Sequence, residues 1–508
     1  MTEKRQPRMP NKLEALLPII TLLGLMISNY LLDWGHDPHI PVLVAACVAC
    51  AVGWFCGVSI TDMINAACDS IHQSMEALLI LLFVGCLVGS FEWCGTIPAL
   101  VYYGLQLFTP TIFLPAVAIL CVIVGLALGS AYTVSATLGI AFMTIGATMG
   151  LNPALVAGAI LAGGCTGDKF SPLSDSTNLS AAASQTGLFD HIRAMIMTTF
   201  PTFLIGLAIF TGISVFGEQG EYDPTLVNGL SNAIENNFQY MSPVLLLPIL
   251  VIVVVAVMKL PAVPGVLLVS AVGCIFAVIF QGASLSDCIS MLHYGYATDT
   301  GDALADQLMT RGGMDSMLWT INIALIAIGF GGIYSRIGAV ESLLGRLIKS
   351  VHTPFQMVLT TILTAMFCIA TMCDQYLGLI VPASMYKEKF DNLGLARNML
   401  SRAQEDGGTL WSPLVPWSSC GAYHSSMLGV ETLSYLPFCF VNLLNPIVSI
   451  ATASWGGNMI YADGTHTGFF GGKLKKGSVP AAPAEAHEIA MQRLAELRAD
   501  GTYKSPEK

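Results

Sequence analysis

The stretch Cys165–Ala183, CTGDKFSPLSDSTNLSAAA, decides the fold because it places ionisable side chains between apolar flanks too long for a soluble core. It carries Asp168, Lys169 and Asp175 among many hydroxyl groups. Ionisable groups are costly at membrane depth, so those that remain there usually face the protein interior and mark an ion pathway. We therefore predict a re-entrant loop that binds a small cation. On composition alone, the alternative is a polar turn outside the membrane.

The residues around this stretch also favour a break in the helix. Gly163, Gly164, Gly167 and Pro172 would weaken or interrupt a continuous helix and free backbone groups. Irregular backbone is tolerated at membrane depth where protein or a water-filled cavity covers it. The predicted loop is therefore expected inside the protein.

The overall composition indicates a polytopic membrane protein. Of the 508 residues, 54% are hydrophobic and 11% are charged, whereas soluble domains carry roughly 25% charged residues. The formal net charge of −11 gives no support for nucleic-acid binding. Most of the 14 cysteines lie in apolar runs, which favours packing over disulfides or a redox site. No cofactor is expected, and the lipid bilayer is the expected environment.

Apolar runs of about 20 residues, the length needed to cross the hydrocarbon layer, predict about 12–14 crossings. Cytoplasmic loops carry the excess of Lys and Arg, so residues 1–13 and the tail 456–508 are expected in the cytoplasm. Lys259 and the group that includes Arg397 and Arg402 are also expected there. The loop 217–240 has no Lys or Arg and is expected outside.

Two halves of the chain repeat a pattern of polar breaks. Ser171-Pro172-Leu173 recurs as Ser412-Pro413-Leu414, a shift of 241 (412 minus 171). The pattern Gly-x5-Gly at residue 89 recurs at residue 332, a shift of 243 (332 minus 89). At the 241 shift, Gly167 falls on Gly408, Thr177 on Ser418 and residues 130–133 on residues 371–374.

An odd number of predicted crossings separates equivalent points, so the halves are expected to be inverted. We predict an all-α, inverted-repeat secondary transporter with broken helices and two re-entrant hairpins. Its first repeat is expected at 14–216 and its second at 241–455. In the tail, residues 456–482 are expected to form a linker. Residues 483–499 are expected to form a short helix with Ile489, Leu494 and Leu497 on one face, either solvated or bound to a partner.

The carboxylates in these breaks are the candidate ion ligands. Asp175, surrounded by hydroxyls, and Asp374, between apolar flanks, are the expected Na+ ligands, since hard cations favour carboxylate, hydroxyl and carbonyl oxygens. Asp168 is a third candidate, with a structural Asp168–Lys169 pair as the alternative. The expected ion-site residues share polar side chains in these segments: Asp168, Ser171, Ser174, Asp175, Thr177, Asn178, Asp374, Gln375, Asp406, Thr409, Ser412 and Ser418.

Some neighbouring residues leave two interpretations open. Glu405 and Asp406 adjoin a basic stretch, so a solvated charge pair is the alternative to an ion site. Thr133, Ser135 and Thr137 either line the site or bond to the carbonyl one turn back. A carboxylate that binds either a proton or Na+, but not both, would couple the two fluxes by competition.

These motifs resemble the NhaC family of sodium/proton antiporters. GDKFSPLSDSTNLSAA (167–182) is similar to the family signature G-D-K-x-S-P-L-S-D-T-T-N and departs from it at Ser176. DQYLGLIVPASMYKEKF (374–390) and LSRAQEDGGTLWSPLVPWSSCGAY (400–423) resemble its second-half signature. The resemblance spans residues 10–455. It implies inverted repeats with two re-entrant hairpins, in a family whose members are often dimers.

The resemblance also implies an antiporter of the inner (cytoplasmic) membrane that exchanges Na+ for H+. The alternative is a Na+-coupled or H+-coupled exchanger of an organic acid such as malate or lactate, or of an amino acid, with Lys169 receiving the anion. An intramembrane enzyme is disfavoured, because the sequence holds no H-E-x-x-H motif and no convincing pair of nucleophile and base.

Overall fold

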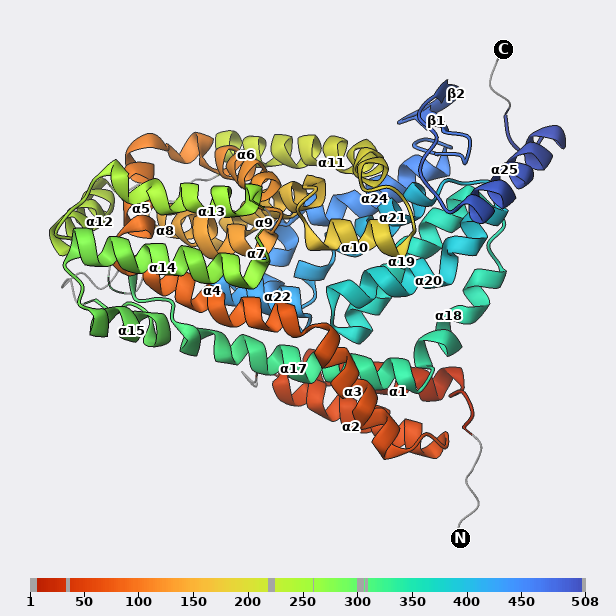
Figure 1. The fold of residues 1–508 in the computed structure, drawn as a ribbon, viewed down its shortest axis with the longest axis horizontal. Helices are drawn as coiled ribbons and strands as arrows, with labels where there is room; N and C mark the ends of the chain where they lie inside the picture. The colour runs from red at the N-terminus through yellow and green to blue at the C-terminus, as the bar shows by residue number, and fades with distance from the viewer. Residues whose placement is uncertain are drawn as a thin grey trace, which may run out of the picture.

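The computed structural model describes residues 7–32, 37–217, 224–258, 260–298, 306 and 309–504. Lys259 and part of the predicted external loop 217–240 lie outside these ranges. Most helices run along the long axis of one bundle, and the tail elements β1, β2 and α25 gather at one end (Figure 1). A large buried apolar cluster fills the bundle between α4, α6, α9 and α14.

The first half of the chain is helical throughout. Its elements are α1 (Lys12–Leu31), α2 (His39–Phe55), α3 (Ile60–Gln73), α4 (Met75–Trp93), α5 (Thr96–Leu107), α6 (Pro110–Leu128), α7 (Ala131–Val134), the π-helical turn η1 (Ser135–Gly139), α8 (Ile140–Thr148), α9 (Pro153–Phe170), α10 (Asp175–Ala183) and α11 (Leu188–Phe216).

The second half adds further helices and one small hairpin of strands. Its elements are α12 (Pro224–Asn237), η2 (Pro243–Leu246), α13 (Leu247–Val257), α14 (Ala262–Gln281), α15 (Leu285–Tyr294), α17 (Met314–Arg336), α18 (Ala339–Lys349), α19 (Pro354–Met372), α20 (Gln375–Asn392), α21 (Arg397–Gly407), η3 (Ser412–Leu414), α22 (Ser419–Leu428), α23 (Thr432–Tyr435), η4 (Leu436–Phe438), α24 (Phe440–Ser454), β1 (Thr465–Gly468), β2 (Gly471–Lys476) and α25 (Ala484–Ala499).

The protein is a multi-pass membrane protein. Within the described ranges, seven helices are long and apolar enough to cross a membrane, and two bent pairs raise the number to nine. One bent pair joins α4 to α5 at 61°, and the other joins α23–η4 to α24 at 57°. This number is lower than the expected 12–14, because several expected crossings are short or broken helices: residues 173–186 contain the nine-residue α10, and residues 413–430 contain the ten-residue α22.

The two halves correspond helix by helix at a shift of 244. α6 begins at Pro110 and α19 at Pro354 (354 minus 110), and α9 begins at Pro153 and α21 at Arg397 (397 minus 153). α10 and α22 begin at the same shift, as do α11 and α23. The 241 alignment of the Ser-Pro-Leu motifs is therefore out of register by three residues. α21 ends early at Gly407, and η3 lengthens the second connection. The inverted orientation and the repeat boundaries stay predictions.

The expected break at the glycines is wrong. α9 runs unbroken through Gly163, Gly164 and Gly167, and it ends at Phe170. These glycines allow α9 to approach α6 closely, since a Cβ at Gly163 would lie 2.3 Å from the Ala118 carbonyl oxygen. Small residues serve this purpose between membrane helices, where backbones pack closely.

The tail is not the linker expected from its composition. β1 and β2 form an antiparallel hairpin, and Asn458 Nδ2 donates to the Met197 carbonyl at 3.1 Å. Arg402, expected in the cytoplasm, is buried and donates to the Asn458 carbonyl at 2.7 Å. Arg397 is also buried, and it pairs with Asp391 at 2.7 Å.

The tail helix packs through a different face from the one expected. α25 buries Ala486, Ala490 and Leu494, whereas Ile489 is 42% exposed. The backbone of Gly394 lies against Leu494, with φ +63 at the glycine. α25 is therefore docked on the body of the protein beside α20, rather than fully solvated.

Candidate functional site

Each half contains a helix interrupted at a residue with left-handed backbone. α6 is followed by Gly129 (φ +65), and α19 is followed by Cys373 (φ +59). A non-glycine residue in this conformation costs on the order of 1–3 kcal/mol and persists where surrounding contacts hold it, often at functional sites. The following helices begin at once: Ser130 caps α7 by accepting from Thr133 N, and Asp374 caps α20 by accepting from Leu377 N at 3.0 Å.

The first hairpin connects α9 to α10 through the turn at residues 171–174. Ser171 Oγ accepts from Leu173 N at 3.2 Å, and Ser174 Oγ accepts from Thr177 N at 3.3 Å to cap α10. Thr177 Oγ1 then donates to the Lys169 carbonyl at 3.3 Å and ties the two arms together. Gly129 lies against this tip, because a Cβ there would be 2.7 Å from Ser174 N. The hairpin tip therefore meets the break between α6 and α7.

The second hairpin connects α21 to α22 in the same manner. Ser418 Oγ caps α22 by accepting from Gly421 N at 3.0 Å, and it donates to the Ser412 carbonyl at 2.7 Å. Ser419 N donates to the Cys373 carbonyl at 2.9 Å. This tip therefore meets the break between α19 and α20.

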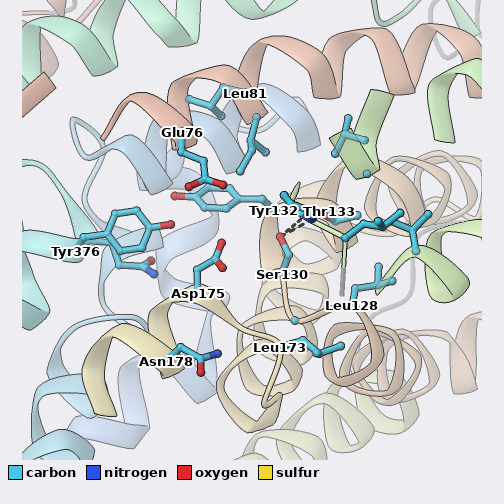
Figure 2. A pocket seen from close by; sticks show the side chains of 18 of the residues that line it. Glu76, Leu81, Leu128, Ser130, Tyr132, Thr133, Leu173, Asp175, Asn178 and Tyr376 are labelled. Carbon is cyan, nitrogen blue, oxygen red and sulfur yellow. Dashed lines mark hydrogen bonds between the residues drawn. The ribbon is translucent and has the colours of Figure 1, made fainter. Parts of the chain in front are cut away.

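A cavity of about 520 Å³ lies where these breaks and tips meet. Glu76, Asp175 and Asp374 contribute carboxylates to its lining. In Figure 2, Glu76 and Asp175 point into the same space, with Tyr132 and Tyr376 beside them. Among the described residues, no Lys, Arg or His lines the cavity.

The cavity carboxylates differ in how firmly they are held. Asp374 is 2% exposed, and its Oδ2 accepts from Ser74 Oγ at 3.3 Å while its Oδ1 caps α20. Asp374 thereby connects the start of α4 to the break in the second half. Asp175 and Glu76 are exposed to the opening. One fixed carboxylate and two accessible ones thus line the same cavity, although no three acidic, His or Cys side chains among the described residues lie close enough together to hold one metal ion.

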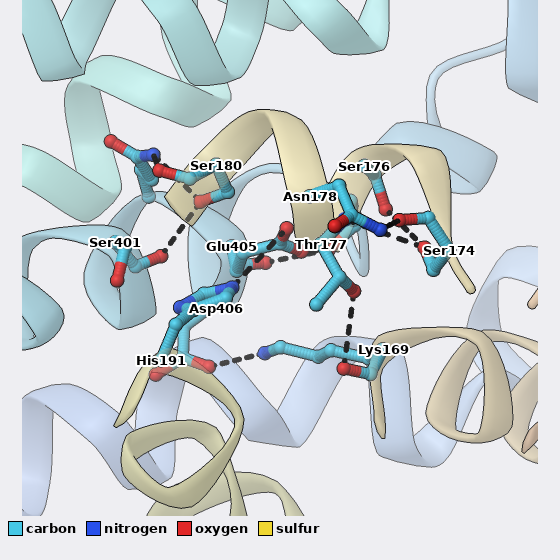
Figure 3. Close-up of polar contacts among 12 residues, drawn as sticks. Lys169, Ser174, Ser176, Thr177, Asn178, Ser180, His191, Ser401, Glu405 and Asp406 are labelled. Atoms are coloured by element: carbon cyan, nitrogen blue, oxygen red, sulfur yellow. Dashed lines mark hydrogen bonds and ion pairs between the residues drawn. The ribbon is translucent and has the colours of Figure 1, made fainter. Parts of the chain in front are cut away.

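A second group of charges is buried between the arms of the two hairpins, where α9 of the first half meets α21 of the second (Figure 3). Lys169 pairs with Asp406, and both side chains are fully buried. Asp406 also accepts from Thr198 Oγ1 at 3.1 Å and from Asn445 Nδ2 at 2.8 Å. The alternative that Lys169 pairs with Asp168 is therefore wrong, since the partner of Lys169 comes from the other half of the chain.

The solvated alternative for Glu405 and Asp406 is also wrong. Every residue of α21 is buried, and Glu405 accepts a hydrogen bond from Thr409 Oγ1. His191 Nε2 lies 3.9 Å from Glu405 Oε1. Thr409 Oγ1 also lies within hydrogen-bond distance of the Glu405 carbonyl, and Thr409 is not among the described residues that line the cavity.

The structure separates the expected site residues into three places. Asp175, Asn178, Asp374 and Gln375 line the cavity. Five others hold the hairpin tips: Ser171, Ser174, Thr177, Ser412 and Ser418. Asp406 belongs to the buried charges between the hairpin arms, and Thr409 donates to Glu405 of that group. Asp168 is half-buried, and its buried Oδ1 has no hydrogen-bond partner among the described residues.

Several cavity residues were not predicted. Glu76 begins an apolar run and reads in the sequence as the polar end of a span, although α4 carries it to the cavity. Tyr132, Tyr376 and Ser419 also line the cavity. Thr133 lines it too, whereas Ser135 contacts His424 at 2.9 Å and Thr137 bonds to the Thr133 carbonyl at 2.7 Å. Thr137 thus follows the packing alternative.

These features define a class of protein. Two corresponding halves, each with a broken helix and a hairpin tip that meet at one acidic cavity inside a membrane protein, are the architecture of a secondary transporter. The chain belongs to the Na+/H+ antiporter family, and it is NhaC-type. The family model described as "Na+/H+ antiporter family" matches residues 165–456. The protein is a transporter and not an enzyme.

Relatives of the chain are antiporters with different named cargoes. The Na(+)/H(+) antiporter NhaC of Alkalihalophilus pseudofirmus is 33% identical over 85% of this chain and 94% of its own length. The malate-2H(+)/Na(+)-lactate antiporter of Bacillus subtilis is 34% identical over 86% of this chain and 93% of its own. The arginine/ornithine antiporter ArcD of Halobacterium salinarum is 32% identical over 89% of this chain and 93% of its own length.

Proposed function

We propose that the protein exchanges Na+ for H+ across the cytoplasmic membrane, with both termini inside the cell and a homodimer as the assembled form. The observation that carries this proposal is the convergence of Asp175 and Asp374, from different halves, on one cavity that also holds Glu76. Carboxylate, hydroxyl and amide oxygens are suitable ligands for a hard cation.

Coupling follows from competition for these carboxylates. A carboxylate that has bound a proton no longer offers the charge that Na+ requires, so occupancy by one ion opposes occupancy by the other. Asp374 would supply the fixed ligand. Asp175, at the tip of the first hairpin, would close on the ion from the opposite side.

Asp374→Asn and Asp175→Asn test this proposal in everted vesicles, where Na+ addition dissipates a preformed pH gradient. Asn is as good a helix N-cap as Asp, so Asp374→Asn removes the charge while α20 keeps its cap. We expect each variant to insert normally and to lose Na+-driven proton movement. Asp62→Asn is the matched control, because Asp62 is 50% exposed and lies outside the cavity lining. Normal exchange by both cavity variants would refute the proposal.

The second candidate is a Na+-coupled or H+-coupled exchanger of an organic acid or amino acid. The cavity volume favours it, because about 520 Å³ falls in the roughly 300–1,000 Å³ range of small-molecule sites. The printed cargoes of the Bacillus and Halobacterium relatives also support an organic solute. Lys169, expected to receive the anion, is instead paired with Asp406 and is not among the described residues that line the cavity.

A further inference from the structure

The cavity has far more room than one bare cation needs. Water occupies about 30 Å³ per molecule in the liquid, so a cavity of about 520 Å³ would hold on the order of 17 water molecules. A site built for Na+ alone requires a few oxygen ligands around the ion. The extra space therefore needs an explanation, either as a hydrated passage or as room for a larger solute.

One wall of the cavity favours the larger solute. α13 contributes Ile252 and Val255, and α14 contributes Val266 and Val269. Leu81 of α4 continues this apolar surface. Aliphatic side chains give water few hydrogen bonds, but they match the carbon skeleton of an organic molecule.

The polar residues of the cavity favour a positive charge. Glu76 and Asp175 lie with Tyr132 and Tyr376 (Figure 2), and Asp374 lines the same cavity. Tyr132 is held in place by the second half, since its ring stacks on His424 at 5.4 Å and meets Tyr423 edge-on at 4.6 Å. Tyrosine rings attract ammonium and guanidinium groups through their faces. Charge and ring chemistry thus select the same class of ligand.

The cavity is poorly equipped to receive a carboxylate. Among the described residues, its lining has no basic side chain. Helix N-termini could bind an anion, but at four of them a side chain already accepts from an amide of the helix: Ser130, Ser174, Asp374 and Ser418. Two others have no side-chain cap: α4, whose first turn carries the Glu76 carboxylate, and α14, which begins after Pro261 of the cavity lining. An acidic group in the cavity would also be repelled by the three carboxylates.

From the apolar wall together with the carboxylates and tyrosine rings, we infer that the protein also transports organic cations through this cavity. These are compounds with an ammonium or guanidinium group on an aliphatic chain and no carboxylate. The inference rests on the proposed function, because the same carboxylates would exchange the organic cation for protons. The charged head would replace Na+ beside Asp175 and Asp374. The aliphatic chain would lie against the wall formed by α13 and α14.

Agmatine and arginine form a matched pair of probes, since they share a guanidinium group and an aliphatic amine and differ in the carboxylate. In everted vesicles containing the full-length protein, agmatine should dissipate the pH gradient and compete with Na+. Arginine should need at least a tenfold higher concentration. An equal or stronger effect of arginine, or no effect of either compound, would overturn the inference.

A variant of the apolar wall localises the effect. Val266→Phe extends a side chain into the cavity, and it should raise the half-saturating agmatine concentration about tenfold more than that of Na+. Equal shifts for the two cations would contradict the proposed placement of the aliphatic chain. If this variant fails to insert, the comparison of agmatine with arginine on the unaltered protein still decides the inference. If the unaltered protein exchanges agmatine for protons but does not exchange Na+, the proposed Na+ cargo is refuted and the inference about organic cations stands.

Discussion

Breaking the buried pair of Lys169 and Asp406 should be among the most damaging single changes to this protein. Both side chains are fully buried, and the pair links α9 of the first half to α21 of the second. Asp406→Asn leaves the hydrogen bonds from Thr198 and Asn445 possible but removes the counter-charge of the ammonium group. Removing one partner of a buried pair costs about 3–5 kcal/mol, because the remaining charge stays buried and uncompensated.

A double-mutant cycle separates this effect from ordinary packing loss. Lys169→Met and Asp406→Asn should each lower the free energy of unfolding by about 3–5 kcal/mol. The double variant contains neither charge, so its free energy of unfolding should fall by no more than that of either single variant. The free energy of unfolding is measured on purified protein in detergent micelles by denaturant titration, with circular dichroism as the signal.

The exposed pair of Arg493 and Glu496 on α25 provides a matched control. Their side chains are 52% and 48% exposed at a distance of 2.5 Å, and such surface pairs couple by about 0–1 kcal/mol. If the losses from Lys169→Met and Asp406→Asn add up, their coupling free energy is as small as that of the surface pair. That result would refute the argument that a buried charge pair holds the two halves together.

Two further predictions concern close packing and the tail. Gly163→Ala should destabilise the protein, because its Cβ would lie 2.3 Å from a carbonyl oxygen of α6, whereas Gly212→Ala in α11 meets nothing within 4 Å and should stabilise the helix by up to about 1 kcal/mol in the same unfolding assay. Burial raises the pKa of Asp463, but hydrogen bonds from Arg498 and Thr465 outweigh it and hold that pKa below its usual value. The stabilisation is therefore present above about pH 4 and is lost as the pH falls through the lowered pKa. Arg498→Ala should remove it and speed proteolytic cleavage of α25 at neutral pH; an unchanged cleavage rate would contradict this prediction.

Much of the fold follows from the pattern of apolar runs and polar breaks. Charged groups such as Asp175 and Asp374 are so costly in lipid that their presence in apolar segments already predicts a protected site. The glycines of α9 were misread because local propensity treats glycine as a helix breaker. In this protein the tight contact with α6 outweighs that cost, and such a contact becomes visible only when both helices are placed.

Partners that are distant in the sequence could not be predicted. Asp406 lies 237 residues from Lys169, whereas Asp168 is adjacent to it, so sequence proximity favoured the wrong pair. Glu76 illustrates the same limit, because a charged residue at the end of an apolar run is normally solvated. The tail was misjudged for a related reason: its many glycines read as a linker, yet they serve the turns of a packed hairpin, where Gly464 and Gly471 have φ +78 and +72.

The acidic residues of the cavity are not repeated between the two halves, although the helices that carry them are. At the shift of 244, Asp175 corresponds to Ser419 (419 minus 175) and Asp374 corresponds to Ser130 (374 minus 130), and all four line the cavity. Each pair of equivalent positions thus holds one Asp and one Ser. An Asp at all four positions, together with Glu76, would place five carboxylates on one cavity, where their mutual repulsion would favour protonation over cation binding. One acid per pair leaves a fixed carboxylate in the second half and an accessible one in the first, and under the exchange that we propose a cation and a proton would compete for both.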